Sequence, residues 1–117
     1  MIKRTIQRIN TIIKHAETVE KDIEGLSLEQ FKESDILVRA TTFLIAQIGE
    51  QMIKIEETLK DDYEDLPWKE ARNMRNLIVH VYDSVKAEVV YQTAKEDLNS
   101  LKNKMLLIRE DLKKINN

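Results

Sequence analysis

Residues 36–55, ILVRATTFLIAQIGEQMIKI, carry apolar side chains on more than one face of a helix. A helix of this kind lies at the centre of a bundle, or contacts both a core and a partner subunit. The apolar pattern starts upstream at Leu28 and continues downstream to Leu59. Ser27 stands three residues before Gln30, which is the spacing of a capping box at a helix start. We therefore predict one long helix from Leu28 to Leu59.

Shorter apolar repeats lie on both sides of this segment. Upstream, apolar residues recur at steps of three and four, the period of one helix face, at Ile2, Ile6, Ile9, Ile13, Ala16, Val19 and Ile23. Gly25 is a predicted C-terminal cap residue of this first helix. Downstream, the polar run 60–65 predicts a loop, and Pro67 is placed in the first turn of a third helix.

The third helix is predicted from Trp68, Ala71, Met74, Leu77 and Ile78, which recur at helical spacing. Asp83 and Ser84 are good N-cap residues, so this helix should break near Tyr82. The apolar residues from Val85 to Leu112 then predict a last helical stretch, as one helix or two.

The composition agrees with helices. The chain has 117 residues, 42% of them hydrophobic and 34% charged, with two glycines and one proline. A β-rich fold needs turn residues more often than this. We predict a single all-α domain, residues 1–117, folded as an up-and-down bundle of four to five helices.

Charge and cysteine content limit the environment and the partners. The absence of cysteine excludes disulfides and fits a reducing cytoplasm, and no continuous apolar segment indicates a signal peptide or membrane span. The net charge of −2 argues mildly against a general nucleic-acid binder. It does not exclude a local basic site, which a dimer could build from two chains.

Most catalytic signatures are missing from the sequence. Neither glycine belongs to a phosphate-binding loop. The two histidines, His15 and His80, are far apart in the sequence and there is no cysteine, so the sequence does not indicate a structural zinc site. We predict no cofactor and no metal.

One segment, Arg75-Asn76-Leu77-Ile78-Val79-His80-Val81-Tyr82, brings chemically active side chains together. At roughly 100° per residue, Asn76 and His80 lie about 40° apart and share a helix face, whereas Arg75 lies about 140° from His80. Arg75 and His80 could still flank one phosphate if the helix end is irregular, or if a two-fold axis completes the site.

These residue types suit RNA cleavage without a metal. Histidine can take a proton from a ribose 2′-OH or give one to the leaving oxygen near neutral pH. Arginine presents a permanent cation matched to phosphate, and Asn76 could orient the imidazole. By spacing alone the signal is weak and the structural alternative is favoured, with Arg75 in a surface ion pair and His80 capping or packing a helix end.

The residues around the motif add a family resemblance. Pro67-Trp68 followed by Met74 to Tyr82 resembles the motif segment of the HepT-like branch of the HEPN superfamily. Two further features match the family in order and spacing. One is Phe31 before a long helix whose apolar run ends in Ile48-Gly49-Glu50, and the other is the later Asp97-Leu98. Many relatives have glycine where this chain has Asn73.

The resemblance implies a homodimeric helical bundle in which the Arg-x4-His motifs of two subunits meet in a shared cleft. Arg75 and His80 would be the catalytic residues of a metal-independent endoribonuclease toxin, with Asn76 supporting them and RNA as substrate. A nucleotidyltransferase antitoxin of the MntA type would silence it by transferring AMP to Tyr82. A bulky anionic group there would repel RNA phosphates.

Alternatives remain at this stage. HEPN-like bundles also occur as non-catalytic companions of nucleotidyltransferases, so Arg75 and His80 could bind a phosphate without cleaving RNA. A purely structural dimer needs neither residue. Trp68 is expected in the core rather than as a base-stacking platform, and His15 on a helix face. Arg72 either faces solvent or extends a basic patch, and Glu50 has no assigned role.

Overall fold

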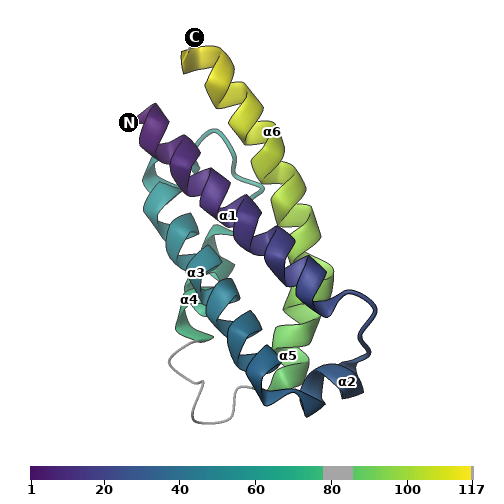
Figure 1. Cartoon of the computed structure of the whole chain (residues 1–117). Coiled ribbons are helices and arrows are strands. Elements are labelled where there is room, and N and C mark those ends of the chain that lie inside the picture. The colour runs from purple at the N-terminus through teal and green to yellow at the C-terminus, as the bar shows by residue number, and fades with distance from the viewer. Residues whose placement is uncertain (78–85, 117) are drawn as a thin grey trace.

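The chain folds into an all-helical bundle, as the sequence predicts (Figure 1). The computed structural model describes residues 1–77 and 86–116. Their elements are α1 (Ile2–Ile23), α2 (Leu28–Glu33), α3 (Asp35–Leu59), α4 (Trp68–Asn76), α5 (Ala87–Gln92), the π-helical segment η2 (Thr93–Asp97) and α6 (Leu98–Asn116). Within these ranges there is no strand. Helices α1, α3, α4 and α5–α6 alternate in direction, which confirms the up-and-down arrangement.

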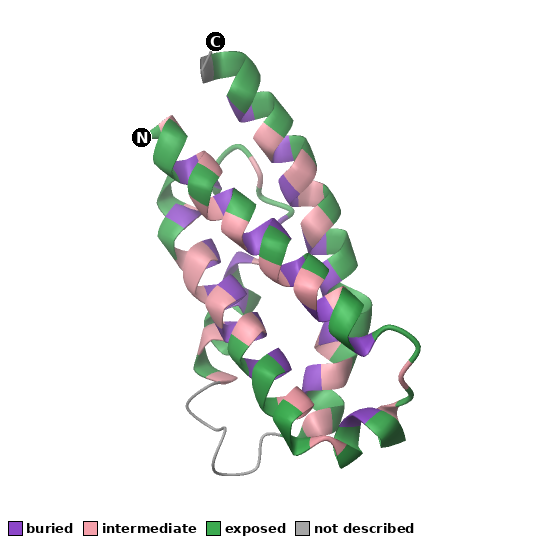
Figure 2. Cartoon of the chain, in the orientation of Figure 1, coloured by how far each residue is buried: buried purple, intermediate pink, exposed green. Residues whose placement is uncertain are grey.

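The core lies between α1, α3 and α6, whose inward faces are buried along their length (Figure 2). It includes Ile9, Ile12, Ala16 and Val19 of α1, Ile45, Ile48, Met52 and Ile55 of α3, and Leu98, Leu101, Met105 and Ile108 of α6. Fully burying one such side chain stabilises the fold by roughly 1.5–3 kcal/mol, which explains why the helix period of the sequence predicts the bundle.

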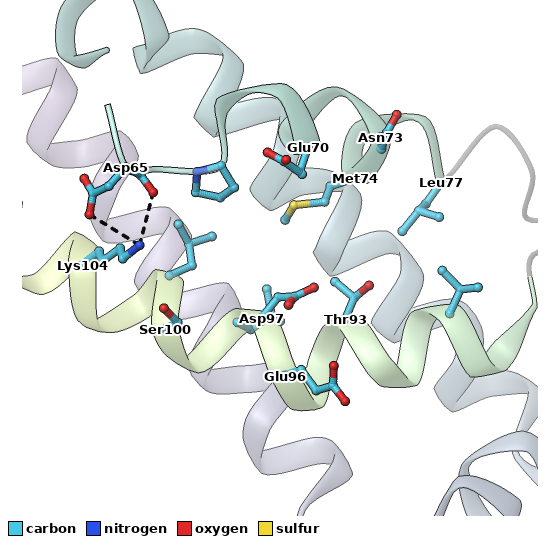
Figure 3. A pocket seen from close by; sticks show the side chains of 14 residues that line it. Asp65, Glu70, Asn73, Met74, Leu77, Thr93, Glu96, Asp97, Ser100 and Lys104 are labelled. Atoms are coloured by element: carbon cyan, nitrogen blue, oxygen red, sulfur yellow. Dashed lines mark hydrogen bonds and ion pairs between the residues drawn. The ribbon is translucent and has the colours of Figure 1, made fainter. Parts of the chain in front are cut away.

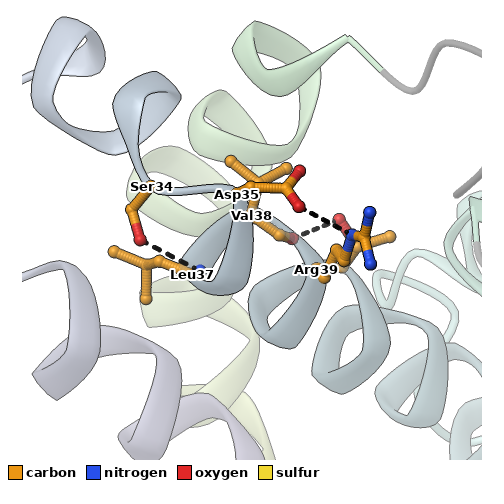
Figure 4. Close-up of polar contacts among 6 residues, drawn as sticks. Ser34, Asp35, Leu37, Val38 and Arg39 are labelled. Atoms are coloured by element: carbon orange, nitrogen blue, oxygen red, sulfur yellow. Dashed lines mark hydrogen bonds and ion pairs between the residues drawn. The ribbon is translucent and has the colours of Figure 1, made fainter.

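The predicted single helix from Leu28 to Leu59 is wrong, because the chain breaks at Ser34 into α2 and α3. Ser34 has extended backbone angles, and its Oγ accepts a hydrogen bond of 3.2 Å from the Leu37 N–H (Figure 4). An ion pair of 3.1 Å between Asp35 and Arg39 follows in the first turn of α3. Serine caps a helix by bonding an N–H that has no partner within the helix, so it starts α3 here.

The predicted end of α1 at Gly25 and the predicted helix start after Ser27 are both confirmed. Gly25 has φ +75°, the left-handed conformation that glycine adopts at least cost after a helix. Ser27 and Gln30 form the capping box, with the Gln30 N–H donating to Ser27 Oγ at 3.1 Å and the Ser27 N–H donating to Gln30 Oε1 at 2.9 Å.

The loop after α3 fixes the start of α4. Pro67 precedes α4 as its N-cap, one residue earlier than predicted. Trp68 is 8% exposed and its Nε1 donates to the Tyr63 carbonyl at 2.9 Å, which confirms its core position. Tyr63 in turn donates its hydroxyl to Asp111 of α6 at 3.0 Å. The beginning of α4 is therefore held against both the loop and α6.

The C-terminal stretch is one continuous helical run, α5–η2–α6, with a π-helical segment inside it. The Tyr91 hydroxyl donates to the Leu26 carbonyl at 2.6 Å, and its ring lies 5.4 Å from that of Phe31. Helix α5 begins after Lys86, and the predicted N-cap residues Asp83 and Ser84 lie outside the described residues.

Candidate functional site

Helix α4 crosses α3 at Gly49, and this crossing places Arg75. A Cβ added to Gly49 would lie 2.5 Å from the Ala71 carbonyl oxygen and 2.6 Å from the Arg75 backbone nitrogen. Real side chains do not approach backbone atoms so closely, so only glycine permits this packing. The sequence gives one signal for it, a glycine inside an otherwise apolar helix, which often marks a close backbone approach.

Arg75 lies in the last turn of α4, at the end of the helix that reaches the motif. Its side chain is half-buried, and its Nε donates to the Oδ1 of the exposed Asn76 at 3.3 Å. The helix ends at Asn76, where the Leu77 N–H bonds back to the Met74 carbonyl in a tighter turn. The structure therefore brings Arg75 and Asn76 together, whereas His80 and Tyr82 lie outside the described residues, as does the predicted break near Tyr82.

Further basic residues lie on the same flank of α4 as Asn76. Lys69 and Arg72 are exposed, and an Arg72 Nη atom is 3.5 Å from Glu56 Oε1 on α3, with the Arg72 side chain 53% exposed. Arg72 thus faces solvent but is partly neutralised by a carboxylate. Arg75 takes part in none of the ion pairs found among residues 1–77 and 86–116. Within the described residues, a carboxylate therefore lies beside the Arg72 guanidinium but not beside that of Arg75.

The opposite flank of α4 borders a groove of about 520 Å³, which α5, η2 and α6 close on the other side (Figure 3). Met74 and Leu77 of α4 face Thr93 and Asp97 across it. Sequence analysis did not identify this groove, because its two walls are distant in the sequence and each wall is an ordinary amphipathic helix. We refer to it below as the α4–α6 groove.

Two titratable groups have shifted pKa values outside the motif. Burial, followed by the charge of Lys14, lowers the pKa of His15, which is half-buried on α1. Burial and the neighbouring Glu96 raise the pKa of Asp97 in the α4–α6 groove. In both groups burial disfavours the charged form, and neither group contacts Arg75 within the described part of the chain.

Two features absent from the described residues bear on alternative functions. No three His, Asp or Glu side chains in the described ranges gather as metal ligands would. No helix in the same ranges has both the length and the apolar character needed to cross a membrane.

Comparison with known proteins identifies the class to which this bundle belongs. A family model described as ribonuclease HepT-like matches residues 2–108. The chain therefore belongs to the HepT-like family of the HEPN superfamily, a family of ribonucleases, and the predicted resemblance is confirmed.

Individual relatives carry the same description. The chain is 32% identical over 99 residues to a "Probable ribonuclease HepT" of Thermococcus cleftensis, covering 81% of this chain and 89% of that protein. It is 25% identical over 94 residues to a "Putative RNase" of Caldanaerobacter subterraneus subsp. tengcongensis, covering 80% and 84%.

A longer relative is the "Gamma-glutamylcyclotransferase and putative RNase" of Methanocaldococcus jannaschii. It is 28% identical over 109 residues, which are 93% of this chain but only 49% of that protein. The chain thus spans about half the length of this relative. No solved structure matches the chain significantly.

Proposed function

We propose that this protein is a metal-independent endoribonuclease in which Arg75 and His80 form the catalytic pair. The match to the ribonuclease family carries the proposal, since it spans residues 2–108 and so includes the whole motif segment. Arg75 would stabilise the negative charge that builds on the phosphate oxygens. His80 would take the 2′-OH proton or protonate the leaving oxygen, and Asn76 would support the pair.

The surroundings of Arg75 support its role. Its Nε donates to the Asn76 Oδ1 at 3.3 Å, so the guanidinium is already held by the neighbouring side chain. A guanidinium held by a neighbour loses less side-chain freedom when it binds a phosphate.

The proposed enzyme is a homodimer with two motifs meeting in one cleft. The side chains of Ile36 and Phe43 on α3 are 82% and 48% exposed. Because α4 runs antiparallel to α3 from the Gly49 crossing, its motif end points towards this half of α3 (Figure 1). Exposed apolar side chains on this half of α3 are of the kind that a second subunit would cover.

The deciding experiment is RNA cleavage in excess EDTA by the wild type, Arg75→Ala and His80→Ala. Arg72→Ala is the matched control, because it removes an exposed arginine from the same helix. We expect both motif variants to lose cleavage by about 10²-fold or more, the typical contribution of a general acid–base or oxyanion group. Arg72→Ala should stay within a few-fold of wild type.

Intact mass, circular dichroism and sedimentation must accompany the assay. No cleavage by a folded, unmodified wild-type dimer would overturn the proposal and favour the non-catalytic phosphate-binding module. Equal loss of folding stability in the two motif variants would show that both residues are structural. Wild-type activity that disappears only in EDTA would contradict metal independence.

We further propose that the protein is the cytoplasmic toxin of a toxin–antitoxin pair, silenced when an MntA-type nucleotidyltransferase transfers AMP to Tyr82. Incubation with such an enzyme and ATP should add AMP to the wild type and stop cleavage. Tyr82→Phe should accept none. Tyr91→Phe is the control, because its hydroxyl is already bonded to the Leu26 carbonyl. Modification that persists in Tyr82→Phe would contradict this assignment.

A further inference from the structure

The α4–α6 groove has an apolar base and an apolar residue on its wall. Met74, Leu98 and Leu101 lie at its base and are nearly buried, whereas Val89 on its wall is 49% exposed. Leu77 closes the end next to the motif. With a volume of about 520 Å³, the groove falls within the roughly 300–1,000 Å³ of typical ligand sites.

The rim of the groove is strongly acidic. Asp65, Glu70, Glu96 and Asp97 line it, together with a single cation, Lys104. That ammonium is already occupied, lying 3.5 Å from the Asp65 carboxylate and 3.2 Å from its carbonyl oxygen (Figure 3). Three carboxylates therefore remain without a cation among the groove residues, although the net charge of the whole chain is only −2.

Two further properties distinguish the Glu96–Asp97 wall of the groove. The raised pKa of Asp97 reflects poor solvation and repulsion by Glu96. Both carboxylates belong to the π-helical segment Thr93–Asp97, a geometry that is rare in helices and frequent at functional sites.

We propose that the α4–α6 groove binds a short amphipathic segment of a partner protein, which inserts an apolar side chain between α4 and α6 and places lysine or arginine beside Glu70, Glu96 and Asp97. Charge complementarity selects this occupant. RNA carries the wrong charge for the rim, and a small polyamine would leave the exposed Val89 on the wall without an apolar partner. The inference does not depend on the proposed nuclease activity, because none of these residues belongs to the Arg75–His80 motif.

The test is titration of the isotope-labelled full chain with a helical peptide, followed by NMR. The peptide is about 12 residues long, or about 18 Å as a helix, with leucine flanked by lysine and arginine on one face. Comparison probes are a scrambled peptide of the same composition, a charge-reversed peptide, spermidine and single-stranded RNA. We expect the amphipathic peptide to shift amides of α4, η2 and the start of α6, and to bind at least tenfold more tightly than every other probe.

Variants locate the site. Glu70→Lys combined with Glu96→Lys should weaken peptide binding at least tenfold, whereas Glu110→Lys, an exposed acid on α6 outside the groove, should change it less than twofold. RNA cleavage by the groove variant should remain near wild type, so failure of peptide binding is distinguishable from failure of the nuclease proposal.

Several results would overturn the inference. The inference fails if the amphipathic peptide does not bind, or if the scrambled peptide or spermidine binds equally tightly. It also fails if the peptide shifts amide signals outside the groove. RNA-induced shifts within the groove would make RNA the occupant. A dimer that dissociates in the groove variant would instead show that a second copy of the chain occupies it.

Discussion

Replacing Gly49 by alanine should separate the effect of helix packing from that of helix propensity. The new Cβ would meet backbone atoms at 2.5 and 2.6 Å, whereas ordinary contacts begin near 3.4 Å. Helix α4 must therefore retreat from α3 by about 0.8 to 0.9 Å. Overpacking of this kind costs up to about 3 kcal/mol, and alanine returns about 1 kcal/mol of helix propensity. We expect a net loss of about 2 kcal/mol of unfolding free energy.

The same displacement should reduce catalysis more than the stability loss explains. Arg75 contributes its own backbone nitrogen to the contact, so it moves with α4. A shift of about 1 Å in a catalytic group can cost about 10²-fold in rate. Gly25→Ala is the control, because it should lose a similar amount of stability to Gly49→Ala. It costs about 1–2 kcal/mol through its positive φ, but its Cβ would meet no atom within 4 Å.

The measurements are urea unfolding and RNA cleavage per folded molecule. Gly49→Ala should lose both stability and cleavage, whereas Gly25→Ala should lose stability alone. An alanine variant at position 49 as stable as wild type would refute the close packing of α4 on α3. Equal cleavage by the two variants would refute the claim that this packing positions the site.

Three further predictions follow from local interactions. Ser34→Ala removes the cap of α3 and should cost about 1 kcal/mol in urea unfolding, whereas Ser100→Ala, exposed near the start of α6 and inside the continuous α5–η2–α6 run, should cost almost nothing; equal costs would contradict the capping role. Tyr91→Phe should cost about 1 kcal/mol for the lost bond to the Leu26 carbonyl, and an unchanged midpoint would show that this bond is not net stabilising. Because the folded-state pKa of His15 is lowered, the protein should lose stability as the pH falls below about 6.5, and the loss should level off below the folded-state pKa. His15→Gln should remove this part of the pH dependence of stability. An identical pH profile of stability in the variant would contradict this prediction.

Most of the fold is encoded in local patterns that the sequence makes visible. The period of apolar residues in α1 and α6, the capping box at Ser27 and the turn at Gly25 each act over a few residues, so they predict elements correctly. The break at Ser34 escaped prediction because apolar residues continue on both sides of it. A serine in that position is compatible with either a helix interior or a cap, and tertiary packing decides between them.

The site is less predictable, for a different physical reason. The motif residues could be selected by chemistry and resemblance, but the crossing at Gly49 depends on two helices meeting at particular positions. The α4–α6 groove likewise depends on how far apart α4 and α6 pack. A sequence pattern identifies which face of a helix is apolar, whereas the spacing between two such faces follows from all the side chains between them.

The distribution of charge about α4 would allow a chain with a net charge of −2 to act on RNA as proposed. The exposed flank of this helix carries Lys69 and Arg72 with Arg75 at its end, whereas Glu70 lies on the groove side. If the chain acts on RNA as proposed, the phosphates would be attracted to the first flank and repelled from the second. Local field, rather than the overall charge, then determines where a polyanion binds. Replacing Glu70 and Glu96 by lysine should therefore increase non-specific RNA binding without raising the rate of cleavage at saturating RNA. A proportional rise in RNA binding and in cleavage rate would show that the groove flank is part of the substrate path.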